Sequence, residues 1–251
     1  MKKLFFLLCI LSTTVFVAQT SNEDLFKKAN LNYKEGKYQN AIDTYLKITA
    51  KDSVSSALYY NLGNAYYKLN NVANTIYYFE KALILDPLNE DAANNLEFAK
   101  RMTIDSIEEL PKTFLQKIET NYIQKLSYNQ WATLSIVLSF LAAILFLFFY
   151  FSSISSKKRV FFLTSILSFF LLFTSVFITY NQHQKHINTK KAIIFAAKIS
   201  VNNAPTNNSD EIFILHEGTK VNILDTVDNW KKIKLADGKI GWVTSESLKE
   251  L

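Results

Sequence analysis

The chain has 251 residues, 49% of them hydrophobic and 20% charged, and a formal net charge of +6 at pH 7. This length predicts one or two domains. The single cysteine, Cys9, excludes a disulfide framework or a cysteine metal site within the chain, and the scattered glycines exclude a glycine-rich phosphate loop. A net positive charge is typical of proteins that bind nucleic acid. Whether it indicates such binding here depends on which segments of the chain carry the charge.

The N-terminus has the pattern of a secretory signal peptide. Lys2 and Lys3 precede a short apolar block, and Ala18 provides a small residue for cleavage. We therefore predict a signal peptide over residues 1–18. An uncleaved membrane anchor is the alternative, because Phe16 is bulky where a small residue is preferred.

Residues 22–102 contain an internal repeat. A shift of 34 positions pairs identical residues, namely Asn30/Asn64, Tyr33/Tyr67, Lys34/Lys68, Asn40/Asn74, Ile42/Ile76, Lys47/Lys81 and Asp52/Asp86. A 34-residue period is typical of tetratricopeptide helix pairs, and residues 59–87 resemble the consensus of that family. This resemblance implies an all-α solenoid with repeats at about 22–55 and 56–89 and a capping helix. The missing side chain of Gly63 allows its helix to approach a neighbour closely.

The first helix of each repeat lines the concave groove of such a solenoid. Polar and aromatic residues recur there on one helical face, at spacings of three and four. They are the candidate peptide-binding residues: Asn30, Tyr33, Lys34, Asn64, Tyr67 and Lys68. We expect the amides to hold the backbone of a peptide and the lysines to offer charge. The alternative is that these residues form a solvated helix face without a ligand. Their identity between the two repeats would then reflect only the general similarity of the repeats.

Residues 131–151 and 160–180 form two apolar runs without a charged residue. A helix needs about 20 such residues to cross the hydrocarbon core of a membrane, so both runs predict transmembrane helices. The loop between them, 152–159, ends in three basic residues, and the positive-inside rule favours a cytoplasmic loop. The outer flanks of the two runs also contain lysines, so the charge rule does not decide the orientation by itself. The predicted signal peptide decides it, because it exports everything before Trp131. The connector, 103–130, and the linker, 181–191, then lie on the exported side. We predict a two-pass inner-membrane protein with both soluble domains in the periplasm.

Residues 192–251 change to short β-rich runs separated by turn residues, which predicts a small all-β barrel. The segment Asp237–Val243, with the sequence Asp-Gly-Lys-Ile-Gly-Trp-Val, resembles the bacterial SH3-like family. This resemblance implies a domain that binds peptides or the stem peptides of the cell wall. Trp230 and Trp242 are the candidate groove residues, because tryptophan offers a large rigid surface with a polar group. The alternative is that they belong to the barrel core.

The sequence contains no motif that predicts catalysis, since it lacks a nucleophile elbow, a His-Glu-x-x-His zinc motif and a P-loop. His183 and His186 have a spacing seen in metal sites, but without a third histidine or a cysteine nearby a surface linker is favoured. His216 lies in a predicted turn and is expected to be solvated. We therefore expect no enzyme activity, no catalytic or metal-binding residues and no cofactor. An enzyme with an unrecognised site is the remaining alternative.

The positive charge is concentrated in residues 111–191, where nine lysines and arginines accompany a single acidic residue, Glu119. Acidic residues outnumber basic ones both in residues 22–110 and in residues 192–251. The basic segments therefore flank the predicted membrane helices, where they can contact anionic lipid headgroups. We expect membrane lipid as a partner and no nucleic acid.

The order of segments describes a multidomain membrane protein with a tetratricopeptide solenoid, two transmembrane helices and a small SH3-like barrel. It resembles the BatE-type proteins of the Bacteroidetes aerotolerance operon, and residues 95–105, 108–111 and 126–132 are similar to that family's connector. The resemblance implies a non-enzymatic inner-membrane scaffold that binds proteins or peptides, including sister membrane proteins with von Willebrand type A domains. The alternative is a cell-wall anchor or sensor whose SH3-like domain binds peptidoglycan.

Overall fold

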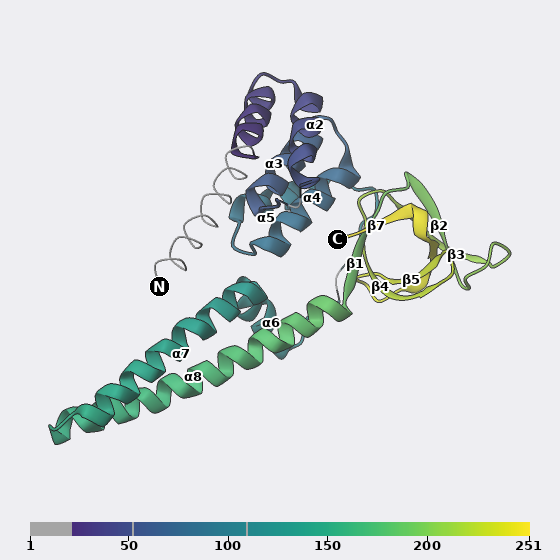
Figure 1. Ribbon diagram of the computed structural model, residues 1–251. Coiled ribbons are helices and arrows are strands. Elements are labelled where there is room, and N and C mark those ends of the chain that lie inside the picture. The colour runs from purple at the N-terminus through teal and green to yellow at the C-terminus, as the bar shows by residue number, and fades with distance from the viewer. Residues whose placement is uncertain (1–21, 52, 109) are drawn as a thin grey trace, which may run out of the picture. The chain divides into compact units, whose positions relative to one another are not determined.

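The computed structural model describes residues 22–251 except residues 52 and 109. The predicted signal peptide, residues 1–18, lies outside this described part. The described residues form two compact units. The first joins the N-terminal helices, the connector up to Glu108 and the C-terminal sheet, and the second contains the rest of the connector and two long helices. Figure 1 shows the N-terminal helices in purple and blue and the sheet in green and yellow.

The N-terminal part of the first unit consists of helix pairs. Residues 22–34 are helical. They are followed by α2 (Tyr38–Thr49), α3 (Ser56–Lys68), α4 (Val72–Leu85) and α5 (Glu90–Lys100). The turn inside each pair contains a residue with positive φ, which is Gly36 at 76° in the first pair and Asn70 at 54° in the second. Glycine and asparagine tolerate this left-handed conformation, so the repeat determines its turns as well as its helices.

These helices share one apolar core, in which Tyr45, Leu62 and Phe79 are almost fully buried. Two helices approach each other closely at Gly63 on α3. A Cβ atom at Gly63 would lie 2.5 Å from two ring carbons of Phe79 on α4. The close helix approach predicted at this glycine is therefore present.

Gly63→Ala is expected to destabilise the chain by a net of about 1–2 kcal/mol, because the added methyl group collides with the buried ring of Phe79. The higher helix propensity of alanine offsets only part of this collision. Thermal unfolding of the purified full chain in detergent, followed by circular dichroism, measures the effect. The control is Lys68→Ala, an exposed position on the same helix, which should leave the midpoint unchanged. Equal midpoints for the two variants would contradict tight packing at Gly63.

Within the described residues the C-terminal sheet has seven strands, which curl into a barrel (Figure 1). They are β1 (Lys190–Ile194), β2 (Lys198–Asn202), β3 (Glu211–His216), β4 (Lys220–Val227), β5 (Trp230–Lys234), β6 (Ile240–Thr244) and β7 (Leu248–Glu250), with a 3-10 helix η2 (Ser245–Ser247). The strand order is β3-β2-β6-β5-β4-β1-β7. The pairings β1–β7, β2–β3, β2–β6, β4–β5 and β5–β6 are antiparallel. Alternate residues point inward and form the core, among them Val201, Leu215, Val221, Ile233 and Val243. This antiparallel sheet fits the predicted SH3-like fold.

The second unit is a helical hairpin preceded by short helices. Its elements are α6 (Phe114–Asn121), the 3-10 helix η1 (Ile123–Lys125), α7 (Tyr128–Phe151) and α8 (Ser155–Asn188). The helices α7 and α8 lie side by side (Figure 1), and the hydroxyl groups of Ser135 and Ser175 form a hydrogen bond of 2.8 Å between them. Among the described residues, these two helices are long and apolar enough to cross a membrane.

Both long helices extend beyond the apolar runs that predicted them. Helix α7 begins at Tyr128, because Ser127 and Gln130 form a capping box. Helix α8 begins at Ser155, inside the predicted loop 152–159, and continues to Asn188 through most of the predicted linker 181–191. A polar segment ends an apolar run but does not end a helix, so these boundaries differ from those expected.

Candidate functional site

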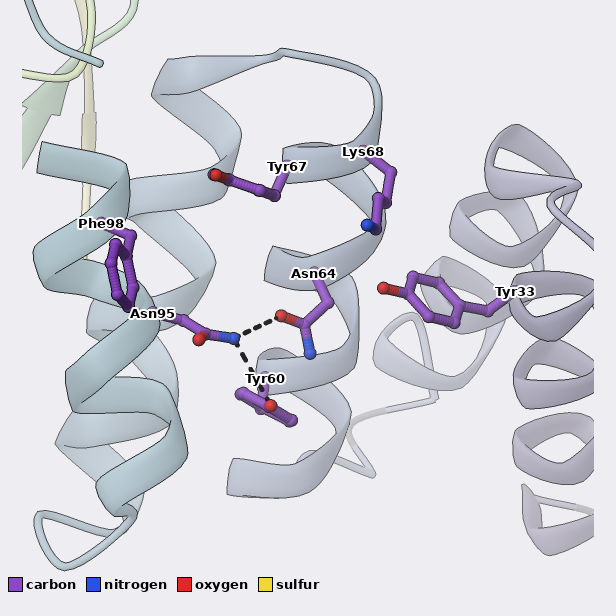
Figure 2. Close-up of a pocket in the computed structure, with 7 residues that line it drawn as sticks. All are labelled: Tyr33, Tyr60, Asn64, Tyr67, Lys68, Asn95 and Phe98. Carbon is purple, nitrogen blue, oxygen red and sulfur yellow. Dashed lines mark hydrogen bonds between the residues drawn. The ribbon is translucent and has the colours of Figure 1, made fainter. Parts of the chain in front are cut away.

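The helical face predicted to bind a peptide contains two adjoining pockets. One has a volume of about 300 Å³ and is lined by Tyr33, Tyr60, Asn64, Tyr67, Lys68, Asn95 and Phe98 (Figure 2). The other has about 250 Å³ and is lined by Asn30, Tyr33, Lys34, Tyr45, Asn61 and Asn64. We call this surface the repeat groove. The structure brings all the predicted groove residues together on it, and α5 adds a third wall.

Pairs of asparagines link successive helices of the repeat groove. Nδ2 of Asn61 donates to Oδ1 of Asn30 over 3.1 Å. One helix further along, Nδ2 of Asn95 donates to Oδ1 of Asn64 over 2.8 Å (Figure 2). The hydroxyl of Tyr45 also donates to Oδ1 of Asn30, over 2.5 Å. The carbonyl oxygens of Asn30 and Asn64 are therefore occupied by the fold.

The groove offers hydrogen-bond donors to a ligand. Within the described residues, no group accepts a hydrogen bond from Nδ2 of Asn30 or Asn64. The same part of the chain holds no salt-bridge partner for Lys34 or Lys68, which are both exposed. Amide donors and ammonium groups suit the carbonyl oxygens and carboxylates of an extended peptide.

Aromatic side chains provide the apolar part of the groove. Phe98 is 54% exposed and Tyr67 is 38% exposed, so both can be covered by a ligand. Burial raises the pKa of Tyr33, and it raises the pKa of Tyr45 to about 12. The Tyr45 hydroxyl therefore remains protonated at neutral pH and keeps its hydrogen bond to Asn30.

The sequence prediction missed several residues of the groove, namely Tyr45, Tyr60, Asn61, Asn95 and Phe98. The 34-residue shift carries Asn61 to Asn95 and Asn64 to Phe98, so one further repeat step would have found the third wall. Tyr45 belongs to the second helix of a pair, and no local pattern shows that its hydroxyl reaches the groove.

The two predicted tryptophans lie on the outer face of the barrel. Trp242 on β6 is opposite Lys232 on β5, and Nζ of this lysine lies 5.7 Å from the centre of the tryptophan ring. Trp230 is opposite Thr244, which makes the two tryptophans diagonal neighbours at roughly 7–8 Å. Both are partly exposed, whereas Val243 points the other way and is fully buried. Neither tryptophan belongs to the buried core cluster of the barrel, so both stay candidate groove residues.

Two family models match the chain, one in the helical repeat region and one in the C-terminal sheet. Residues 56–89, which include α3 and α4, match the family model of the tetratricopeptide repeat. Residues 201–249 match the model of the bacterial SH3 domain. No curated protein matches the sequence.

The SH3 domain contacts the tetratricopeptide helices and the connector through the turn between β3 and β4. Oδ2 of Asp105 accepts a hydrogen bond of 2.7 Å from the backbone N–H of His216 and one of 2.6 Å from the hydroxyl of Thr219. Oδ1 of the same carboxylate lies 2.7 Å from Nδ1 of His216. Gly218 lies between His216 and Thr219 in the same turn, and a Cβ atom there would lie 2.9 Å from a methyl carbon of Val72 on α4. The expectation that His216 is solvated is therefore wrong, because Asp105 holds it.

Three further contacts join the tetratricopeptide helices to the SH3 domain and enlarge this interdomain contact. The carboxylate of Glu80 on α4 pairs with Lys220 of β4 at 2.5 Å. The ring of Phe195 meets Tyr77 of α4 edge-on, with 5.7 Å between the ring centres. Ile193 of β1 belongs to the same buried apolar cluster as the tetratricopeptide helices. The repeat and the SH3 domain thus form one unit, which we call the head.

The interdomain contact is expected to weaken in acid. Burial alone would raise the pKa of Asp105, but its hydrogen bonds with His216 and Thr219 outweigh burial and hold the pKa below the ordinary value of 3.8. A lowered folded-state pKa gives stability that is present above the unfolded-state pKa and is lost as pH falls through the folded value. The contact should therefore be complete at neutral pH and weaken below about pH 4.

Electron paramagnetic resonance of a doubly spin-labelled chain measures this acid response. The labels replace Lys28 in the repeats and Thr226 on β4, both exposed, in a Cys9→Ser background. The distance distribution should broaden in acid. Asp105→Asn should already be broadened at neutral pH and show a smaller acid response. An identical acid response in both proteins would contradict the role of the Asp105 carboxylate.

Proposed function

We propose that this chain is a non-enzymatic membrane scaffold that holds protein or peptide partners in the repeat groove on the exported side of the inner membrane. The observation that carries this proposal is the groove, where amide donors, two lysines and exposed aromatic rings recur on successive helices. The order of segments and the connector motifs support membership of an aerotolerance-type (Bat) assembly. Its sister membrane proteins with von Willebrand type A domains are then the candidate partners.

The proposal includes insertion of α7 and α8 into the membrane. Their large apolar side chains are mostly exposed, for example Phe140 at 66% and Phe170 at 67%. Soluble proteins rarely expose a continuous apolar surface of this extent. A bilayer would cover it.

The interdomain contact supports a two-pass topology. Asp105 precedes α7 and His216 follows α8, and yet the two residues are hydrogen-bonded. If α7 and α8 cross the membrane, the segments before and after the hairpin would lie on the same side of it, as two crossings provide. The three basic residues near the hairpin turn, 157–159, together with the signal peptide predicted over residues 1–18, favour a cytoplasmic turn, so we propose that the head lies in the periplasm.

Site-specific photo-crosslinking in native membranes tests the scaffold function. A photoreactive amino acid replaces Phe98 in the groove or, as the control, Ile84, which is 37% exposed on α4 and does not line the groove. We expect a discrete protein adduct from position 98 and none from position 84. The same adducts from both positions, or none from position 98, would reject a partner in the groove.

Binding of peptidoglycan by the SH3 domain is the second candidate function. Trp230, Trp242 and Lys232 favour it, because they place two large rings and a cation together on the outer face of the barrel. The test is retention of the full chain, in detergent, on purified peptidoglycan, with Trp242→Ala for comparison. The wild-type chain should be retained and the variant should elute earlier. No retention of the wild-type chain would remove this candidate.

A further inference from the structure

The short helix α6 carries apolar side chains that the rest of the described chain leaves uncovered. Phe114 is 76% exposed, Leu115 75% and Tyr122, just after the helix, 72%. At about 100° per residue, Phe114, Leu115 and Ile118 occupy one sector of the helix, and Thr120 lies away from it. The helix is therefore amphipathic, and its apolar side faces outward.

The same segment is fixed to one end of the helical hairpin. The backbone oxygen of Ile123 accepts hydrogen bonds from the indole N–H of Trp131 on α7, over 2.9 Å, and from the amide of Gln182 on α8, over 2.7 Å. Glu119 of α6 forms an ion pair with Lys185 of α8. These contacts hold α6 and η1 at the end where α7 begins and the apolar run of α8 has finished.

That end of the hairpin has the composition of a membrane interface. Trp131 opens the first apolar run, and tryptophan is enriched at the level of the lipid headgroups. Lys112, Lys117 and Lys125 lie within the same short segment. Exposed apolar side chains accompanied by lysines are typical of helices that lie in the interface plane of a membrane with anionic lipid.

We propose that α6 and η1 form an interfacial anchor, with Phe114, Leu115 and Tyr122 inserted between the headgroups of an anionic leaflet. This inference rests on the proposed insertion of α7 and α8, because their ends set the depth of the segment. The occupant of the apolar face is then lipid and not a second protein. The anchor would tie the connector to the membrane surface in addition to the two crossings.

Nitroxide accessibility in reconstituted vesicles tests this anchor on the full chain. Single cysteines replace Leu115 on the apolar side, Thr120 on the same helix as the matched control, or Phe140 in the middle of α7, each in a Cys9→Ser background. The vesicles contain phosphatidylcholine and phosphatidylglycerol. Power saturation compares collision with oxygen, which concentrates in lipid, and with a water-soluble nickel chelate.

For the anchor, we expect the ratio of oxygen to nickel collisions at Leu115 to exceed that at Thr120 several-fold and to remain below that at Phe140. Equal ratios at Leu115 and Thr120, with a high ratio at Phe140, would overturn the anchor and leave membrane insertion intact. Low access of both reagents to Leu115 would mean a protein contact and would also overturn it. A water-like ratio at Phe140 would reject the insertion of the hairpin itself.

Discussion

Asp105→Ala is expected to release the SH3 domain from the tetratricopeptide helices in the full chain. The Asp105 side chain is only 12% exposed, and its two oxygens hold the backbone and ring of His216 and the hydroxyl of Thr219. Loss of hydrogen bonds to a charged acceptor, with partly buried donors left behind, costs about 3 kcal/mol. The ratio of associated to separated domains should fall by about two orders of magnitude.

The distance between spin labels at positions 28 and 226 reports this release. The wild-type chain should give a narrow distribution, and Asp105→Ala should add a broad component. Asp210→Ala removes an exposed carboxylate from the same SH3 domain and should leave the distribution narrow. A narrow distribution in both variants would show that the interdomain contact does not depend on Asp105.

Reversal of charge at Lys34 and Lys68 together is expected to reduce crosslinking from position 98 at least tenfold. The two ammonium groups are the exposed cations of the repeat groove, and their exchange for carboxylates would repel a ligand whose acceptors they bind. A tenfold loss corresponds to about 1.4 kcal/mol of binding free energy. The yield of adduct in native membranes, normalised to the amount of chain, is the measurement.

The control for this reversal is the pair Lys28→Glu and Lys47→Glu. It changes the net charge equally at exposed positions of the same repeats that do not line the groove. The control should keep the adduct, and thermal unfolding should show that both double variants remain folded. An unchanged adduct after reversal at Lys34 and Lys68 would contradict a role for groove charge.

The repeat groove could be predicted from the sequence because its residues recur at intervals of 34 positions. Residues 34 positions apart occupy equivalent places on successive helices, so Asn30 and Asn64 had to face the same surface. The same logic reaches Asn95 only if the capping helix is treated as a third repeat. The sequence could not predict which asparagine of each pair donates its amide N–H and which accepts with its side-chain oxygen. The structure shows that Asn61 and Asn95 donate.

The interdomain contact could not be predicted in the same way. The hairpin lies between Asp105 and His216 in the sequence, and neither residue belongs to a motif that predicts a long-range contact. Gly218 lies in the turn between β3 and β4, and its lack of a side chain lets the turn approach α4. Contacts of this kind depend on complementary surfaces of two folded domains, which local periodicity does not encode.

The head must lie outside the cytoplasm for either proposed function, so cysteine accessibility in spheroplasts tests the account most directly. Single cysteines at Lys28, Thr226 or Ser156, in a Cys9→Ser background, are exposed to a maleimide that does not cross membranes. We predict labelling of positions 28 and 226 in intact spheroplasts and labelling of position 156, near the hairpin turn, only after lysis. Labelling of position 156 in intact spheroplasts, with positions 28 and 226 protected, would contradict the account.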